Sequence, residues 1–125
     1  MNDTSNKYAA TLLRVSLGIM LIAHGLLKVL VFTLPGTVGF FDSVGFPGWM
    51  AYPVIALEVV GGVLLILGLW VRPLVALTIP VLLGAVWVHL GNGWVFSNPN
   101  GGWEYPAFLT IAAIVVFLQG QNQKA

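Results

Sequence analysis

The most restrictive feature of this sequence is residues 12–31, LLRVSLGIMLIAHGLLKVLV, in which twenty mostly apolar residues include three basic side chains. At about 1.5 Å of rise per residue, a helix of this length covers roughly 30 Å, the thickness of the hydrocarbon core of a bilayer. Charged groups at membrane depth are costly and usually face protein or water, with a partner. The stretch therefore predicts a membrane-spanning helix in which Arg14, His24 and Lys28 require partners from elsewhere in the chain.

The composition agrees with a membrane location, because 58% of the 125 residues are hydrophobic and only 7% are charged. A soluble domain has about 25% charged residues, which it needs to cover its surface. We therefore expect one integral membrane domain over residues 1–125. The net charge of +1 gives no reason to expect a nucleic-acid partner, and the absence of cysteine excludes thiolate catalysis and cysteine-ligated clusters within this chain.

Apolar segments separated by Gly- and Pro-rich stretches place four spans at about 8–32, 52–70, 74–90 and 105–118. The fold class predicted is thus an all-α membrane protein, a four-transmembrane-helix bundle. Residues 33–51 combine loop formers with several aromatic residues, which predicts a short interfacial segment in the first outer loop, with one helix near 38–44. The short connection at 71–73 predicts a hairpin of the second and third spans. Gly18 and Gly25 share a stripe of the first span, where small residues allow another helix to approach closely.

Basic residues near the span ends predict the orientation. Lys7 and Lys124 lie near the termini and Arg72 lies in the short connection, whereas the two longer loops contain no Lys or Arg. Both termini are therefore expected in the cytoplasm. The aromatic residues of the opposite side then form an outer interfacial belt of Trp49, Tyr52, Trp94, Trp103 and Tyr105.

The ionisable groups of the four spans lie at similar depths in the outer half of the bundle. Counting from the outer ends, Lys28 is roughly 6 Å deep, Glu58 roughly 9 Å and His24 roughly 12 Å, with His89 and Glu104 at the rim. We expect Lys28 or His24 to pair with Glu58, and His89 to lie near Glu104. The alternative interpretation is that such pairs only hold the helices in register.

These residues predict an outward-facing polar pocket. Its base would be the catalytic set His24, Lys28 and Glu58, with His89, Glu104, Trp103 and Trp49 binding the ligand at the rim. Imidazole and carboxylate groups relay protons, and an apolar pocket with aromatic walls suits a flat lipophilic ligand such as a quinone head group. A metal site is not expected, because no HExxH or ExxH motif is present.

Arg14 is the one basic residue predicted in the inner half of the first span. Its long side chain is expected to reach the cytoplasmic interface or to cap carbonyl groups. The alternative is that Arg14 binds ligand and continues a polar path inward from the pocket.

Four pieces of the sequence together resemble the DoxX family of small bacterial membrane proteins, which is related to DoxD. The pieces are LLRVSLGIMLIAHGLLKV, GFPGWMAYPVIALEVVGGVLLILGLWVRP, AVWVHLGNG and GGWEYPAFLTIAAIVVFL. The resemblance implies a four-helix bundle in the bacterial cytoplasmic membrane and a link to quinones, because DoxD-type members belong to a thiosulfate–quinone oxidoreductase. Thiosulfate chemistry is not expected here, because no cysteine is available to carry sulfane sulfur.

The leading hypothesis is therefore a quinone-interacting redox protein or subunit. Two alternatives remain at this point: a non-enzymatic conduit for protons or small molecules, and a membrane scaffold for soluble redox enzymes. The glycine-lined helices would also permit a homodimer.

Overall fold

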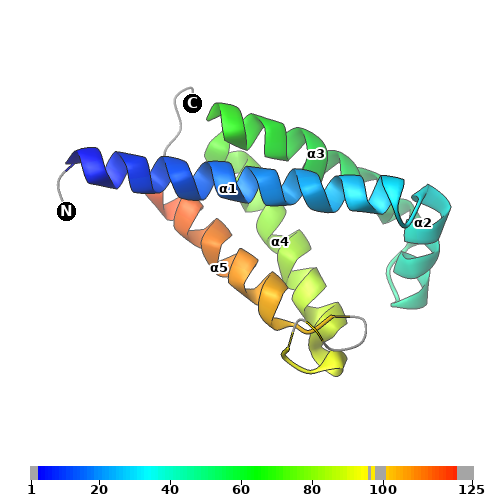
Figure 1. The fold of residues 1–125 in the computed structure, drawn as a ribbon. Helices are drawn as coiled ribbons and strands as arrows, with labels where there is room; N and C mark the ends of the chain where they lie inside the picture. The colour runs from blue at the N-terminus through cyan, green and yellow to red at the C-terminus, as the bar shows by residue number, and fades with distance from the viewer. Residues whose placement is uncertain (1–2, 96, 98–100, 121–125) are drawn as a thin grey trace.

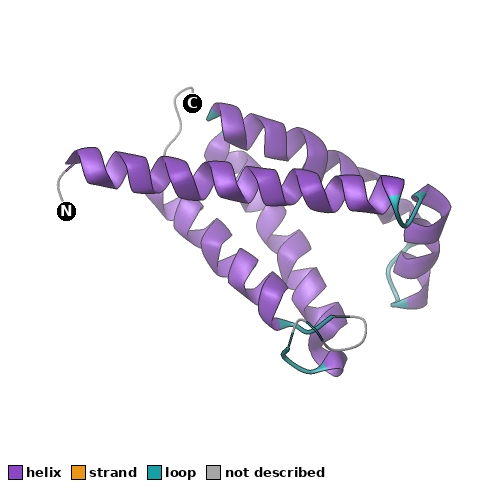
Figure 2. Cartoon of the chain, viewed as in Figure 1, coloured by secondary structure: helices purple, strands orange, loops and turns teal. Residues whose placement is uncertain are grey.

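The computed structural model describes residues 3–95, 97 and 101–120, and every regular element in these ranges is helical (Figure 2). In chain order the elements are α1 (Asp3–Leu30), α2 (Leu34–Ser43), the 3₁₀ turn η1 (Gly48–Met50), α3 (Ala51–Leu67), α4 (Val71–His89), the 3₁₀ turn η2 (Leu90–Asn92) and α5 (Glu104–Gln119). The predicted all-α class is confirmed.

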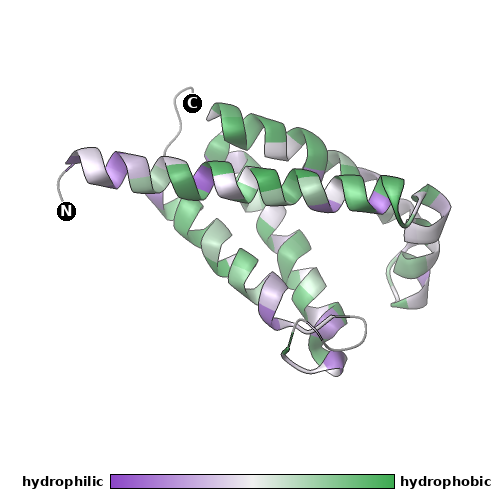
Figure 3. Cartoon of the chain, viewed as in Figure 1, coloured by the Kyte–Doolittle hydropathy of each residue, from purple (hydrophilic) through white to green (hydrophobic). Residues whose placement is uncertain are grey.

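Within the described residues, three helical segments are long and apolar enough to cross a membrane (Figure 3). They are Asp3–Leu30, Gly48–Leu67 and Val71–Asn92, so the prediction of a helical membrane protein is also confirmed. α5 is apolar but has 16 residues, equivalent to roughly 24 Å. α2 covers the region in which one short helix was expected and begins four residues earlier than predicted.

The connection between α3 and α4 is also displaced from its predicted position. Gly68 adopts the left-handed conformation, φ 78°, and ends α3 by donating to the carbonyls of Leu64 and Leu65. α4 then begins at Val71, so Arg72 and Pro73 lie in its first turn instead of forming the connection. Proline is tolerated there because its missing N–H would have no intrahelical partner.

α1 and α3 pack against each other along most of their length and run antiparallel (Figure 1). A Cβ atom added to Gly18 would lie 2.7 Å from the carbonyl oxygen of Gly62, and one added to Gly62 would lie 2.6 Å from that of Gly18. About two turns further along α1, a Cβ atom added to Gly25 would lie 3.2 Å from the Cβ of Glu58. The predicted glycine stripe therefore does permit close helix contact.

α4 packs mainly against α5, so the bundle consists of two helix pairs that diverge from the α3–α4 connection (Figure 1). Near that connection the pairs share one apolar core. Its largest fully buried side chains are Leu17, Leu21, Leu65, Val71, Val75 and Val116. Away from the connection the pairs separate, and α2 lies across that end of α1 and α3.

Candidate functional site

The site begins with an ion pair between the two closest helices. The Lys28 Nζ lies 2.8 Å from the Glu58 Oε1, and the two side chains are 23% and 6% exposed. Lys28 is in the last turn of α1 and Glu58 is in the middle of α3. The close packing of Gly25 on Glu58 brings them to the same level. The predicted pairing of Glu58 with Lys28 is therefore present.

The end of α1 carries a second feature that shapes the site. Thr33 has a φ of 69°, which is unusual for a β-branched residue, and its side chain accepts a hydrogen bond from the N–H of Gly36. The buried Thr37 hydroxyl lies 3.0 Å from the carbonyl oxygen of Lys28 and 2.9 Å from that of Thr33. These contacts fold α2 back against the end of α1, beside the ion pair.

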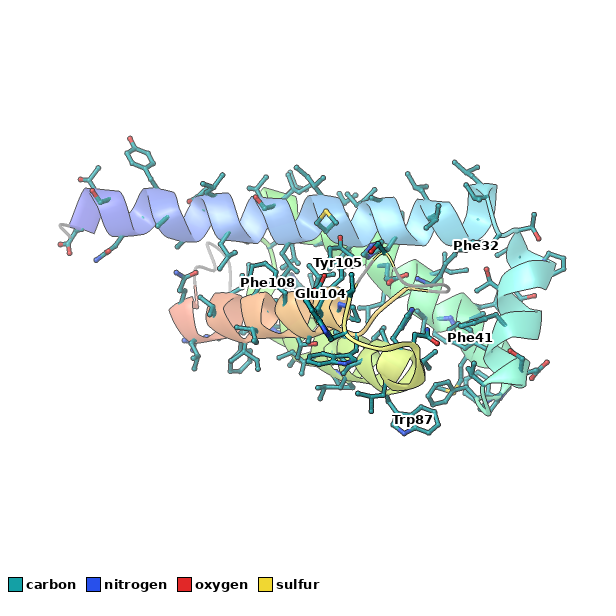
Figure 4. The ribbon with its side chains drawn as sticks, turned by 60° about the horizontal axis from the view of Figure 1, so that its bottom comes forward. Phe32, Phe41, Trp87, Glu104, Tyr105 and Phe108 are labelled. Carbon is teal, nitrogen blue, oxygen red and sulfur yellow. The ribbon has the colours of Figure 1, made fainter. Side chains whose placement is uncertain are left out.

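The five α-helices and the turn η1 line a cavity of about 640 Å³ next to this ion pair. Its volume is within the range of about 300–1,000 Å³ that small-molecule sites occupy. Most of the lining is apolar, and the aromatic residues that line it are Phe32, Phe40, Phe41, Phe46 and Tyr105. Figure 4 shows Phe32, Phe41 and Tyr105 beneath the second half of α1, each from a different segment. The polar part of the lining is formed by His24, Lys28, Glu58 and His89.

Aromatic contacts close the side of the cavity that α2 covers. The ring of Phe46, which follows α2, lies 6.3 Å from that of Phe41 and 5.6 Å from that of Trp87 on α4. α2 and its following loop therefore connect the two diverging helix pairs through apolar contacts.

The two histidines approach the cavity in different ways. The His89 Nδ1 lies 2.6 Å from the carbonyl oxygen of Ala85, one turn earlier in α4. Because a carbonyl can only accept, Nδ1 donates its proton there, and Nε2 is the nitrogen available to a ligand. The His24 ring meets the edge of Tyr105 with centroids 5.4 Å apart and planes at 89°.

Tyr105 is a cavity residue that the sequence analysis assigned only to the outer aromatic belt. It lies in the first turn of α5, and its hydroxyl is 3.7 Å from the Met20 sulfur of α1. The sequence signal was its position directly after Glu104, itself a candidate. On a helix, neighbours point about 100° apart, so the identity of the inward residue depends on the rotation of the helix.

Three predicted rim residues do not belong to this cavity. The described residues that line it do not include Glu104, Trp103 or Trp49. Trp49 lies in η1 and is 67% exposed, and Trp103 precedes α5 and is 37% exposed. Phe40 and Phe41 of α2 line the cavity, where the tryptophans were expected.

Arg14 does not make the carbonyl-capping contacts that were one of its expected roles. It is 7% exposed, and its Nε and Nη1 atoms are buried without any hydrogen-bond partner. Neither of these two atoms therefore caps a carbonyl group, and the side chain is enclosed by the protein. It also does not line the cavity.

The described residues contain no group of three or more His, Asp or Glu side chains that could hold a metal ion. The chemistry available at the site is therefore that of one ammonium, one carboxylate, two imidazoles and a phenol in a largely apolar chamber.

Comparison with known proteins gives two matches. The family model described as DoxX matches residues 9–91, which contain His24, Lys28, Glu58 and His89 but not α5. Over 84 residues the chain is 44% identical to a Bacillus subtilis (strain 168) protein named "Putative oxidoreductase CatD". This alignment covers 67% of the chain and 61% of the Bacillus protein. No solved structure matches the chain.

Proposed function

Because this chain belongs to the DoxX family, we propose that it is a quinone-binding redox protein of the membrane that works beside a soluble redox partner. One observation carries the proposal: the Lys28–Glu58 pair, His24 and His89 meet in a cavity with otherwise apolar walls. A quinone ring is flat and lipophilic, and its two carbonyl oxygens require hydrogen-bond donors. The name of the Bacillus relative, an oxidoreductase, supports redox chemistry.

The polar residues can hydrogen-bond the oxygens of a quinone and can exchange the protons that its reduction requires. The Lys28 ammonium has three donors, and Glu58 uses one of them, which leaves donors for a quinone oxygen. The Nε2 of His89, which is free of the contact that Nδ1 makes with Ala85, is the nitrogen that would face a quinone or quinol oxygen in this proposal. Reducing the quinone to the quinol takes two electrons and two protons. In this proposal the soluble partner supplies the electrons, and Glu58 and His24 exchange the protons.

The proposal includes α5 as a fourth membrane crossing, with residues 1–125 forming one domain. The Arg72 Nε donates to the Phe117 carbonyl at 3.1 Å, which ties the end of α5 to the beginning of α4. At its other end, Tyr105 contacts His24 near the opposite side of the bundle. α5 thus extends from the level of the α3–α4 connection to the level of His24, and in this proposal thinning of the bilayer accommodates its shorter length.

The proposed location is the bacterial cytoplasmic membrane, with both termini in the cytoplasm. Lys7 in α1 and Arg72 in α4 lie at the end of the bundle where α1 begins and α3 ends, consistent with the positive-inside rule. Lys124, the third basic residue used for the orientation, lies outside the described residues.

The packing of α1 speaks against the alternative function, a conduit for protons or small molecules. Leu17 and Leu21 occupy α1 between Arg14 and His24 and are 2% and 1% exposed. The notional polar path from the cavity to Arg14 therefore meets a packed apolar core.

The test is binding of short-chain benzoquinone and naphthoquinone analogues to the purified protein, measured by thermal shift and by quinone extracted from native membranes. We expect stabilisation of the wild type and its loss in Glu58→Gln, whereas Asp3→Asn, an acid outside the cavity, should behave as wild type. Absence of any quinone effect on the wild type would reject the proposal and would favour the scaffold alternative.

A further inference from the structure

Arg14 is a buried cation for which the proposed function has no use. Its side chain is 7% exposed, and both Nε and Nη1 are buried without a hydrogen-bond partner. Arginine does not escape this cost by losing its proton, because the guanidinium group stays charged in proteins. Leaving buried donors of a charged group unsatisfied costs several kcal/mol in general. A membrane protein that retains such a group is expected to provide it with an anion.

The carboxylate of α3, that of Glu58, already has a partner and is not available to Arg14. Glu58 is paired with Lys28 and packs at the level of Gly25, about three turns or roughly 16 Å along α1 from Arg14. Asp3 lies a similar distance away in the opposite direction, at the first turn of α1. Neither of these two carboxylates is therefore close enough to serve the two unpartnered nitrogens of Arg14.

The packing of α1 places Arg14 at one end of the bundle. Gly18 lies against Gly62, Leu65 and Ile66 of the antiparallel α3. Arg14 is one turn earlier in α1, so it is level with the last turn of α3 and the connection at 68–70. Figure 1 shows the first turns of α1 projecting beyond the ends of α3 and α5 at this side. In a membrane-spanning bundle this level is the head-group region of one leaflet.

A second arginine marks the same level. Arg72 lies in the first turn of α4 and donates from Nε to the carbonyl of Phe117 in the last turn of α5. The helix ends of α3 and α5 present the negative ends of their dipoles here, which favours cations. A dipole alone does not, however, satisfy the N–H groups of Arg14 that have no acceptor.

We propose that Arg14 binds a phosphate oxyanion at this end of the bundle, supplied by a phospholipid head group or by soluble phosphate. The planar guanidinium matches the geometry of phosphate oxygens and forms charge-assisted hydrogen bonds with them. Phosphate is the anion that the head-group level offers in quantity. This site is separate from the quinone cavity, which Arg14 does not line.

The test compares the wild type with Arg14→Gln and Arg14→Lys in mild detergent. Lys7→Gln is the matched control, because it removes one positive charge near the same end of α1 without touching the buried guanidinium. Bound lipid is measured by native mass spectrometry and thermal shift, with phosphatidylglycerol, phosphatidylcholine, a glucosyl diacylglycerol without phosphate, and inorganic phosphate against chloride at equal ionic strength.

We expect the wild type to prefer the phosphate-bearing molecules over the glucosyl lipid. Arg14→Gln should weaken that binding at least about tenfold, which corresponds to the loss of a hydrogen bond to a charged group. Arg14→Lys should fall in between, and Lys7→Gln should match the wild type. Stabilisation by the phospholipids alone identifies a lipid as the source, whereas an equal effect of inorganic phosphate identifies soluble phosphate.

Two results would overturn the proposal. One is a wild type that binds the glucosyl lipid as well as the phospholipids and ignores inorganic phosphate. The other is Arg14→Gln with undiminished phosphate-dependent stabilisation. If Arg14→Gln does not fold, the Arg14→Lys variant and the comparison of lipids on the wild type still test whether Arg14 binds phosphate, because neither measurement requires the uncharged variant.

Discussion

Replacing the Lys28–Glu58 ion pair by apolar side chains separates its structural role from its functional one. The two charges meet at 2.8 Å, and the Glu58 side chain is only 6% exposed. Glu58→Leu, Lys28→Met and the double variant form a double-mutant cycle in which each single change leaves one charge without its partner.

The magnitudes follow from the burial of the two partners. Glu58→Leu leaves an ammonium in an apolar chamber, and breaking a buried pair in this way costs about 3–5 kcal/mol. Lys28→Met leaves a carboxyl group that one proton neutralises, so we expect a smaller cost of about 1–3 kcal/mol. The double variant has no stranded charge and should be within about 1 kcal/mol of the wild type.

Both stability and ligand binding are measured on the same samples. Unfolding in mixed micelles is followed by the fluorescence of the five tryptophans, and binding of a short-chain quinone is followed by thermal shift. If the pair serves the ligand, the double variant recovers the stability of the wild type but does not bind the quinone.

Two outcomes would refute this reasoning. Costs that simply add in the double variant would mean that the two charges are not energetically coupled in the folded protein. A double variant that binds quinone as the wild type does would mean that the pair only sets helix register.

Three further predictions concern packing and closure. Gly62→Ala places a Cβ 2.6 Å from the facing carbonyl of α1 and should destabilise the protein by about 1–3 kcal/mol in micelle unfolding. Phe46→Cys with Trp87→Cys, whose native rings are 5.6 Å apart, should cross-link with a short thiol-reactive linker and slow quinone binding in stopped-flow mixing. Arg72→Met removes the hydrogen bond to the end of α5 and should cost about 0.5–1.5 kcal/mol in the same unfolding assay.

Each of these changes has a matched control in the chain. Gly39→Ala should be tolerated, because nothing lies within 4 Å of the added Cβ. The cross-link is confined to the two introduced thiols, since the natural chain has no cysteine, and the same double variant before the linker is added gives the reference rate of quinone binding. Unchanged stability of Gly62→Ala would contradict the close α1–α3 packing, and unchanged stability of Arg72→Met would assign no energetic value to the contact with α5.

The sequence by itself determined the helical membrane class and the presence of an ion pair or hydrogen-bonded pair at Glu58. A chain with 7% charged residues cannot cover a soluble surface, and its apolar segments have the length of membrane-spanning helices. That Glu58 would pair with Lys28 or His24 followed from depth, because the rise of a helix is fixed and buried charges need a partner of opposite sign; the structure shows that Lys28 is the partner.

Only the tertiary structure decided which side chains face inward. Depth is a one-dimensional coordinate, whereas the lining of a cavity depends on how each helix is rotated about its axis. The sequence therefore placed Glu104 and Trp103 at the rim, but the rotation of α5 turns Tyr105 into the cavity. In the same way, the packing of Gly18 on Gly62 fixed the position of α1 on α3, and Arg14 is buried beside this contact, which its place in the sequence did not reveal.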